Sequence, residues 1–365
     1  MATHTSTSAL VLREIGSPLK LETIHLRSLK PNEAVVEMEA TGICHTDLSC
    51  MSGILPVATP NVLGHEGENS SIFFSTKFLT GAFRYEGAGI VRKIGSGVSH
   101  VGVGDKVLLS YDFCTSCKSC IAEHPAYCEK FFPLNFGGSR SDGTISLNGI
   151  QGEDIHCNFF GQSSFSRHAI VAANSMVKVP ADTNLRLYAP LGCGLQTGAG
   201  AILNSLRVTK GSSLVVWGVG PVGLAAIMTG VIAGATPIIA IDLQPDRLEL
   251  AKSLGATHSL DGSDKDIVKK VIELSKSNGV EFAVDCTGVP NVVENMINSL
   301  GTKGRGCTVG APKPGAVASI DIFAHLIHGR EYIGSTEGDC IPSKVSGNIF
   351  CLFLLLTYKD DTLLN

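Results

Sequence analysis

The sequence predicts a two-domain protein in which a β-rich domain precedes an α/β domain built on a parallel sheet. The chain has 365 residues, which is enough for about two domains of ordinary size. From Ala9 to about Val179, short β-type runs are separated by glycines and polar turns. After Pro190, strand-like runs alternate with helix-like runs, which is the pattern of βαβ units and a parallel sheet.

The expected elements follow from local patterns of apolar, polar and glycine residues. In the first domain we expect strands at 34–38, 89–91, 106–109 and 169–171. In the second we expect strands at 214–217, 237–241, 282–285 and 306–309, with helices at 222–233, 246–254 and 264–275. No long linker separates the two patterns, so we place the boundary near Leu187. The expected domains are 1–187 and 188–344, followed by an atypical tail at 345–365.

Composition and charge exclude several classes of protein. The net charge is −4 and only 17% of residues are charged, so we expect no basic surface for nucleic acid. Residues 1–10 lack the basic and apolar regions of a secretory signal. The uncharged run 214–241 is broken by glycines and prolines into a strand, a helix and a second strand. We therefore expect a cytoplasmic protein that enters no membrane.

A glycine motif predicts a dinucleotide site. Gly218, Gly220 and Gly223 form G-x-G-x-x-G directly after a predicted strand and at the start of a predicted helix. Asp242 ends the next strand, where a carboxylate accepts from a ribose 2′-hydroxyl and repels a 2′-phosphate, which favours NAD over NADP. Thr287 and Gly288 follow a later strand at the same sheet edge. The expected cofactor-binding residues are Gly218, Gly220, Pro221, Val222, Gly223, Asp242, Thr287 and Gly288.

The twelve cysteines are better interpreted as metal ligands and buried thiols than as disulfides, because no secretory signal is visible. Four of them, Cys114, Cys117, Cys120 and Cys128, have the spacing C-x2-C-x2-C-x7-C. Four thiolates leave no open position on a tetrahedral ion, so this set predicts a structural zinc site. An iron–sulfur cluster is the alternative, but the ferredoxin run closes after three residues with Cys-Pro, whereas here the gap is seven and Glu129 follows.

Further motifs give a resemblance to a known family. Gly64-His65-Glu66, the four-cysteine lobe, the run Leu191-Gly192-Cys193-Gly194 and the glycine motif occur in this order. Together they resemble the zinc-containing alcohol dehydrogenases of the medium-chain dehydrogenase family, and the aryl- or benzyl-alcohol type in particular. The resemblance implies a GroES-like catalytic domain and a Rossmann domain that binds NAD.

The resemblance also implies roles for residues that spacing alone does not connect. Catalytic zinc is expected on Cys44, His65 and Cys193, with the fourth position left for water or a substrate oxygen. Zinc would polarise a primary aryl or allylic alcohol or aldehyde while hydride passes to or from the nicotinamide. By matching position, Thr46 contacts the substrate oxygen, Asp47 and Glu66 are acids near the zinc, and His45 contacts the pyrophosphate. Ser49 stands where some members carry a proton-relay histidine. Two zinc ions per chain and a homo-oligomer formed through the Rossmann domain are implied as well.

Two tracts depart from the family's pattern. Residues 67–86 separate Gly64-His65-Glu66 from Gly87-Ala88-Gly89-Ile90-Val91, which are continuous in the family. Residues 345–365 do not match the family's closing sequence. We interpret both tracts as translated introns, and we expect a truncated C-terminus and a Rossmann sheet that lacks its closing strands. An impaired or non-catalytic derivative that binds zinc and a dinucleotide is therefore the alternative to an active dehydrogenase.

Overall fold

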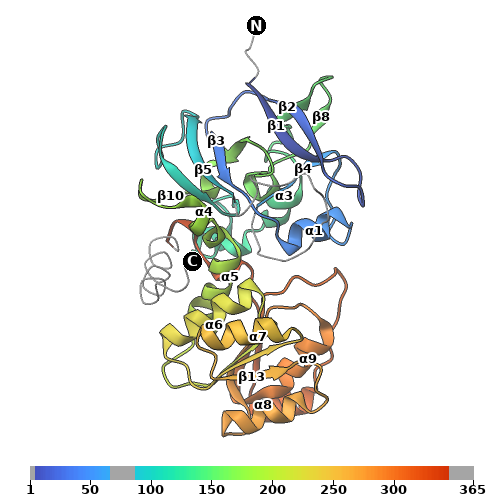
Figure 1. Cartoon of the computed structure of the whole chain (residues 1–365), viewed down its shortest axis with the longest axis vertical. Coiled ribbons are helices and arrows are strands. Elements are labelled where there is room, and N and C mark those ends of the chain that lie inside the picture. Colours follow the sequence, from blue (N-terminus) through green and yellow to red (C-terminus); the bar gives the residue numbers. More distant parts are fainter. Residues whose placement is uncertain (1–4, 66–86, 345–365) are drawn as a thin grey trace. The chain divides into compact units, whose positions relative to one another are not determined.

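The computed structural model describes residues 5–65 and 87–344 (Figure 1). Glu66, the tract 67–86 and the tail 345–365 therefore lie outside the described residues. The chain divides into two compact units. The first holds Met1–Cys193 together with Ile341–Asn365, and the second holds Gly194–Cys340.

The first unit contains two antiparallel five-stranded sheets. One has the order β4-β1-β2-β7-β8 and the other β10-β6-β5-β3-β9. The strands of the first sheet are β1 (Thr5–Leu12), β2 (Lys20–Leu26), β4 (Asn61–Val62), β7 (Leu147–Gly149) and β8 (Asp154–Ile155). Those of the second are β3 (Glu33–Ala40), β5 (Ala88–Ile94), β6 (Lys106–Leu109), β9 (His168–Ala172) and β10 (Met176–Lys178). All four strands expected in this domain are confirmed, within β3, β5, β6 and β9.

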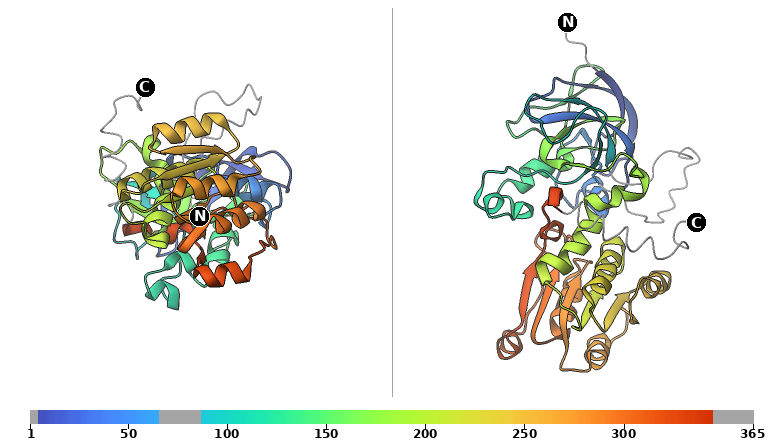
Figure 2. Two further views of the ribbon diagram at one scale, coloured as in Figure 1. Left: turned by 90° about the horizontal axis from the view of Figure 1, so that it is seen from below. Right: turned by 90° about the vertical axis from the view of Figure 1, so that its left-hand side faces the viewer.

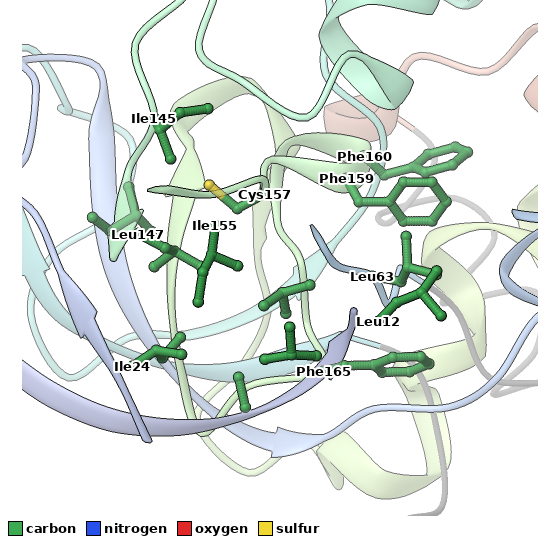
Figure 3. Close-up of a cluster of buried hydrophobic side chains, with 14 of the residues drawn as sticks. Leu12, Ile24, Leu63, Ile145, Leu147, Ile155, Cys157, Phe159, Phe160 and Phe165 are labelled. Carbon is green, nitrogen blue, oxygen red and sulfur yellow. The ribbon is translucent and has the colours of Figure 1, made fainter. Parts of the chain in front are cut away.

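Each sheet of the first unit contributes a buried apolar cluster. Figure 3 shows the larger one, in which Leu12, Ile24, Leu63 and Ile155 pack together with the rings of Phe159, Phe160 and Phe165. The second cluster forms on alternate positions of β3, β5 and β6, as expected for strands with one buried face. Leu63 lies directly before Gly64 and His65, so the segment that carries a predicted zinc ligand is anchored in the larger core.

Several short helices in the first unit were not expected from the sequence. These are α1 (His45–Met51), α2 (Lys118–Ile121), α3 (Phe131–Phe136), α4 (Leu185–Tyr188) and the 3-10 turns η1 (Pro125–Tyr127), η2 (Phe159–Gly161), η3 (Ala173–Ser175) and η4 (Ala189–Gly192). None exceeds seven residues, too few to show a helical apolar period. The first unit is therefore β-rich rather than purely β.

The second unit is built on six parallel strands in the order β13-β12-β11-β14-β15-β16. Their bounds are β11 (Leu214–Trp217), β12 (Ile238–Asp242), β13 (His258–Asp261), β14 (Val280–Asp285), β15 (Leu300–Thr308) and β16 (Glu331–Gly334). This is the 3-2-1-4-5-6 order of a Rossmann fold. The expectation of missing closing strands is wrong, because β16 pairs with β15 from Arg305 opposite Glu331 to Thr308 opposite Gly334.

Helices cover both faces of this sheet (Figure 2). One face packs against the π-helical turn η5 (Ala201–Leu206), α6 (Pro221–Ala233) and α7 (Pro245–Ser253), while α5 (Gly194–Gly200) packs on α6. The other packs against α8 (Ile267–Ser275) and α9 (Pro290–Ser299). The remaining helical elements are α10 (Ile322–His328) and η6 (Glu337–Asp339).

The expected helices of the second unit are confirmed as α6, α7 and α8. Helix α8 begins at Ile267 rather than Asp264, because the Asp264 side chain accepts a hydrogen bond from Asp266 N and forms a turn first. The uncharged run 214–241 forms β11, α6 and β12, so it is a strand-helix-strand unit as expected. Among the residues that the structure describes, no helix is both long and apolar enough to cross a membrane.

Candidate metal centres and dinucleotide site

The four-cysteine lobe forms a compact cluster of sulfur atoms in the first unit. The Sγ atoms of Cys114, Cys117, Cys120 and Cys128 all lie within 4.8 Å of one another. The separation is 3.9 Å for Cys114 and Cys120 and 4.0 Å for Cys117 and Cys128, and all four thiols are free. A regular tetrahedron with zinc–sulfur bonds of about 2.3 Å has sulfur–sulfur edges of about 3.8 Å. The donor set therefore fits one tetrahedral zinc ion.

Backbone groups of the lobe favour thiolates at this position. Cys117 N donates to Cys114 Sγ at 3.3 Å, and Lys130 N donates to Cys128 Sγ at 3.3 Å. Although burial opposes ionisation, hydrogen bonds from Ser116 and Cys117 lower the pKa of the Cys114 thiol to about 6. Burial and the neighbouring thiols raise the pKa of Cys120. A bound dication would offset the repulsion among four thiolates, which the protein donors alone do not.

A second group of metal-binding side chains forms where α1 meets the segment after β4. Cys44 caps the N-terminus of α1, and its Sγ accepts from Thr46 N at 3.4 Å. Asp47 is fully buried and joins the two segments, because its carboxylate accepts from Cys44 N at 2.9 Å and from Gly64 N at 3.0 Å. His65 Nδ1 lies 3.3 Å from Asp47 Oδ2. The predicted residues Cys44, Asp47 and His65 are thus brought together.

The imidazole of His65 is 1% exposed and sits among charged and aromatic groups. Burial would lower the pKa of His65, but the adjacent Asp47 carboxylate and Cys44 thiol raise it, and the net pKa lies well above the usual range. A carboxylate on Nδ1 is the arrangement that orients a zinc-bound histidine and leaves Nε2 as the ligand atom. The Cys44 thiol and the His65 imidazole are donors suited to zinc, and the Asp47 carboxylate orients the imidazole.

The remaining residues predicted for the catalytic zinc have different placements. Cys193 is at the C-cap of η4, next to Gly192, whose carbonyl accepts from Ser110 Oγ at 2.7 Å. Thr46 Oγ1 lies 3.6 Å from Cys44 Sγ, and His45 is the exposed first residue of α1.

The glycine motif of the second unit forms a tight turn between β11 and α6. Gly218 has φ +85°, a conformation that side chains rarely adopt, and an added Cβ would lie 2.6 Å from Thr287 Cγ2. A Cβ on Gly223 would lie 2.1 Å from the carbonyl oxygen of Gly218, so only glycine lets the helix start this close to the turn. Gly220 is the N-cap of α6 and Pro221 its first residue. The N-cap of α6 therefore carries no side chain, which lets a phosphate approach the backbone there.

Two carboxylates lie at the carboxyl ends of β12 and β14, the strands on either side of β11. Asp242, at the end of β12, accepts from Val219 N at 2.8 Å and from Gln244 N at 2.9 Å. Asp285, at the end of β14, accepts from Thr287 N at 2.9 Å and from Gly288 N at 3.1 Å. The structure therefore brings both predicted segments to the edge of the sheet where dinucleotides bind in this fold.

Two features of these sites were missed in the sequence. Arg247 on α7 reaches within 3.9 Å of Asp242 Oδ2, which places a cation beside the predicted ribose carboxylate. Arg247 lies in the first turn of α7, five residues after Asp242 at the end of β12, and this short separation could have indicated the contact. Phe160 stacks on His65 with ring centroids 3.9 Å apart and planes 12° apart, and Phe159 contacts the same ring edge-on at 5.0 Å. In the sequence, Phe159 and Phe160 could not be distinguished from ordinary core residues of a β-rich domain.

Comparison with protein families assigns both parts of the chain. Residues 30–68 and 81–181 match the family described as alcohol dehydrogenase GroES-like domain. Residues 221–349 match the family described as zinc-binding dehydrogenase. The first match omits 69–80, which lie within the tract 67–86 that departs from the pattern of related sequences.

Individual relatives agree with these families. Geraniol dehydrogenase of Castellaniella defragrans is 37% identical over 340 residues, which are 93% of this chain and 85% of the relative. The structure of an alcohol dehydrogenase zinc-binding domain protein from Burkholderia ambifaria is 41% identical with a TM-score of 0.88, covering 96% of this chain and 90% of that one. Benzyl alcohol dehydrogenase from Acinetobacter calcoaceticus is 38% identical with a TM-score of 0.85, covering 97% and 89%. The chain therefore belongs to the zinc-containing alcohol dehydrogenases of the medium-chain family, oxidoreductases that use zinc and NAD(H).

Proposed function

We propose that this protein interconverts primary aryl or allylic alcohols and their aldehydes, with NAD(H) as the hydride carrier. The observation that carries the proposal is the joining of Cys44 and His65 by the buried Asp47 carboxylate, because this builds half of a catalytic zinc site. The similarity to a geraniol dehydrogenase and a benzyl alcohol dehydrogenase supports the substrate class. Two phenylalanine rings, Phe159 and Phe160, also line the imidazole of His65.

The proposed ligands divide into two sets. Cys44, His65 and Cys193 would hold the catalytic zinc, and the four cysteines of the lobe would hold a structural zinc. When bound, the catalytic ion supplies Lewis-acid polarisation of the substrate oxygen, and the nicotinamide accepts or gives hydride. A set of three protein ligands leaves one coordination position for that oxygen.

The chain's own residues orient the site and move the proton. Asp47 fixes Cys44 through its backbone N–H and His65 through Nδ1, so it holds both ligands at once. Thr46 Oγ1 lies beside Cys44 Sγ, where its hydroxyl would hydrogen-bond the substrate oxygen and relay the alcohol's proton by passing its own hydroxyl proton to water. Gly218, Gly220, Pro221, Val222 and Gly223 would surround the pyrophosphate at the start of α6, while Thr287 and Gly288 line the same strand edge. Glu66 and His45 keep the roles implied by the family resemblance.

A substrate panel tests this proposal directly. We expect zinc-loaded protein to form NADH with benzyl alcohol, cinnamyl alcohol and geraniol, and to do so with higher kcat/KM than with ethanol. Absorbance at the NADH band measures the rate. Protein that holds zinc but forms no NADH with any benzylic or allylic alcohol would contradict the proposal.

The carboxylate of Asp242 should determine the choice between NAD and NADP. Placing two like charges together costs several kcal/mol, so Asp242→Asn should raise the ratio of kcat/KM for NADP over NAD by at least about 10-fold. Glu249→Gln removes an exposed carboxylate from α7, the helix that follows β12, and serves as the control. An unchanged cofactor ratio in Asp242→Asn would show that this side chain does not face the ribose.

We also propose that the protein forms a homo-oligomer through its second unit. Helix α10 exposes Ile322, Phe323 and Leu326, which are 81%, 71% and 73% exposed. Strand β16 is the last strand of the six-stranded sheet. Among the described residues, the strand that pairs with it is β15. Several exposed apolar side chains, together with a strand at the edge of a sheet, form the kind of surface that a second copy of the chain covers in an oligomer.

Light scattering after size exclusion tests the assembly. The double variant Phe323→Glu with Leu326→Glu should shift the protein to a monomer, because it places charges in the proposed interface. Leu21→Glu alters an equally exposed apolar residue on β2 of the first unit and should leave the assembly unchanged. A wild-type protein that is monomeric at micromolar concentration would contradict this proposal.

A further inference from the structure

The imidazole of His65 is held from two directions. Asp47 contacts its Nδ1 edge at 3.3 Å, while Phe160 covers one face of the ring. The stacking is close, with centroids 3.9 Å apart and an angle of 12° between the planes. Phe159 meets the same imidazole edge-on at 78°. An edge contact and a face contact together fix both the position and the plane of the ring.

The backbone of Phe160 adopts an unusual conformation in making this contact. Its φ is 52° and its ψ 35°, in the left-handed region that bulky residues rarely occupy. Asn158, Gly161 and Ser163 also have positive φ, so the segment 158–163 repeatedly departs from ordinary backbone. Strained backbone of this kind persists only where the surrounding structure over-determines it, and it concentrates at functional sites.

Hydrogen bonds attach this segment directly to the residues before His65. Ser163 Oγ donates to Val62 O at 2.6 Å, and Ser164 N donates to Gly64 O at 2.8 Å. Phe165 N donates to Leu63 O at 3.1 Å. These three bonds fix the segment that carries Phe160 against the segment that carries His65, and they explain how the left-handed backbone is maintained.

Aromatic rings from α3 pack edge-on against the Phe160 ring. The ring centroid of Phe136 lies 5.2 Å from that of Phe160 and 5.5 Å from that of Phe159. The centroids of Phe131 and Phe160 are 6.4 Å apart. Helix α3 follows Cys128 directly, with Phe131 N donating to Cys128 O at 2.8 Å. The aromatic rings therefore extend from α3 to the imidazole, and a backbone hydrogen bond joins α3 to the four-cysteine lobe.

We propose that Phe160 is a positioning residue for the catalytic zinc site, because its ring holds the plane of the His65 imidazole. The proposal rests on the function proposed above, in which His65 is a zinc ligand. Asp47 restrains only one nitrogen, about which the ring could still tilt. The stacked Phe160 ring removes that freedom and keeps Nε2 directed to one point. Groups that orient a metal-binding histidine typically affect metal affinity by about 10–100-fold.

The experiment compares zinc affinity across variants of the full chain, measured by competition with a chelator. Phe160→Leu keeps apolar bulk but removes the flat ring, and we expect the catalytic zinc to bind about 10-fold less tightly than in the wild type. Phe160→Tyr restores a ring and should recover nearly wild-type affinity. Phe132→Leu is the matched control, because Phe132 stacks on Phe136 and is 51% exposed. Its zinc affinity should not change.

Replacement of zinc by cobalt gives a second measurement, which a general loss of stability would not change. The visible absorption of the Co²⁺ protein reports the geometry of the ligands, so Phe160→Leu should shift the bands of the catalytic site and leave those of the four-cysteine lobe unchanged. Wild-type affinity and an unshifted spectrum in Phe160→Leu would overturn the proposal. Should that variant fail to fold, Phe160→Met fills similar volume without a flat ring, and the same two results decide.

His65→Ala separates this inference from the proposed function. The variant should lose the catalytic zinc altogether while keeping the zinc of the lobe. A His65→Ala protein that retains both ions at wild-type affinity would show that the ligand assignment itself is wrong. Loss in His65→Ala with no change in Phe160→Leu would instead overturn only the role of Phe160.

Discussion

Replacing His65 by alanine is expected to lower kcat/KM for benzyl alcohol oxidation by about 1000-fold or more. Metal polarisation of a substrate oxygen is worth several kcal/mol in the transition state, and each 1.36 kcal/mol corresponds to a factor of ten in rate. His65 is 1% exposed and lies against Asp47, so no other side chain can move into its place without disrupting the core. Cys44→Ala should have a similar effect, because its thiol borders the same imidazole.

Initial rates of NADH formation measure this loss, and zinc analysis shows its cause. The variant should retain one zinc ion per chain, in the four-cysteine lobe. His168→Ala removes a half-buried histidine of β9, whose ring contacts Thr7, and should leave both the rate and the zinc content near wild-type. A His65→Ala protein with a wild-type rate would exclude His65 from the catalytic centre.

Replacing Cys120 by serine is expected to release the structural zinc and to destabilise the first unit. Structural zinc sites bind with apparent free energies of about 10–16 kcal/mol in zinc-finger peptides, and that energy holds the surrounding chain folded. The lobe has little apolar core of its own, and Ile121 on α2 is 72% exposed. A loss of about 3 kcal/mol would lower Tm by about 6–12 °C in a domain of 150–250 residues.

Thermal unfolding together with zinc analysis measures the effect. The Cys120→Ser protein should hold one zinc ion where the wild type holds two, and its Tm should fall. Ser116→Ala removes a hydroxyl that donates to Cys114 Sγ but no ligand, and it should keep both ions. If Cys120→Ser retained two zinc ions and its full Tm, the four thiols would not form a metal site.

The two metal centres differ in how far the sequence could predict them. The lobe cysteines lie within 15 consecutive residues, so spacing alone indicates that their sulfur atoms can meet. Cys44 and His65 are joined through Asp47, whose carboxylate bonds Cys44 N and Gly64 N. Nothing in the spacing of these residues reveals that contact. Only the resemblance to a family connected them.

The dinucleotide turn was predictable because its glycines serve local backbone geometry. Gly218 needs positive φ and Gly223 needs space beside the Gly218 carbonyl, and both requirements follow from the strand-turn-helix order. The closing strand β16 was missed, since its four residues Glu331–Gly334 are mostly exposed and carry no alternating pattern. The short helices α1 to α3 were missed for a similar reason. Their formation depends on caps and packing rather than on periodicity.

Phe160 could not be identified from sequence because its role depends on a rare backbone conformation. A positive φ is usually signalled by glycine or asparagine, and Asn158 and Gly161 do carry that signal on either side of it. A phenylalanine gives no such signal of a positive φ. Only the three-dimensional contact of its ring with His65 distinguishes it from the other aromatic residues of the same core.

The zinc content of the full-length protein tests the central claim most directly. Zinc analysis of purified chain, with NADH formation from benzyl alcohol measured on the same sample, separates an active dehydrogenase from a non-catalytic derivative. We predict two zinc ions per chain and steady NADH formation, with Cys44, His65 and Cys193 holding one ion and the four-cysteine lobe the other. One zinc ion per chain, retained in Cys44→Ala but lost in Cys120→Ser, together with no NADH formation would contradict this account.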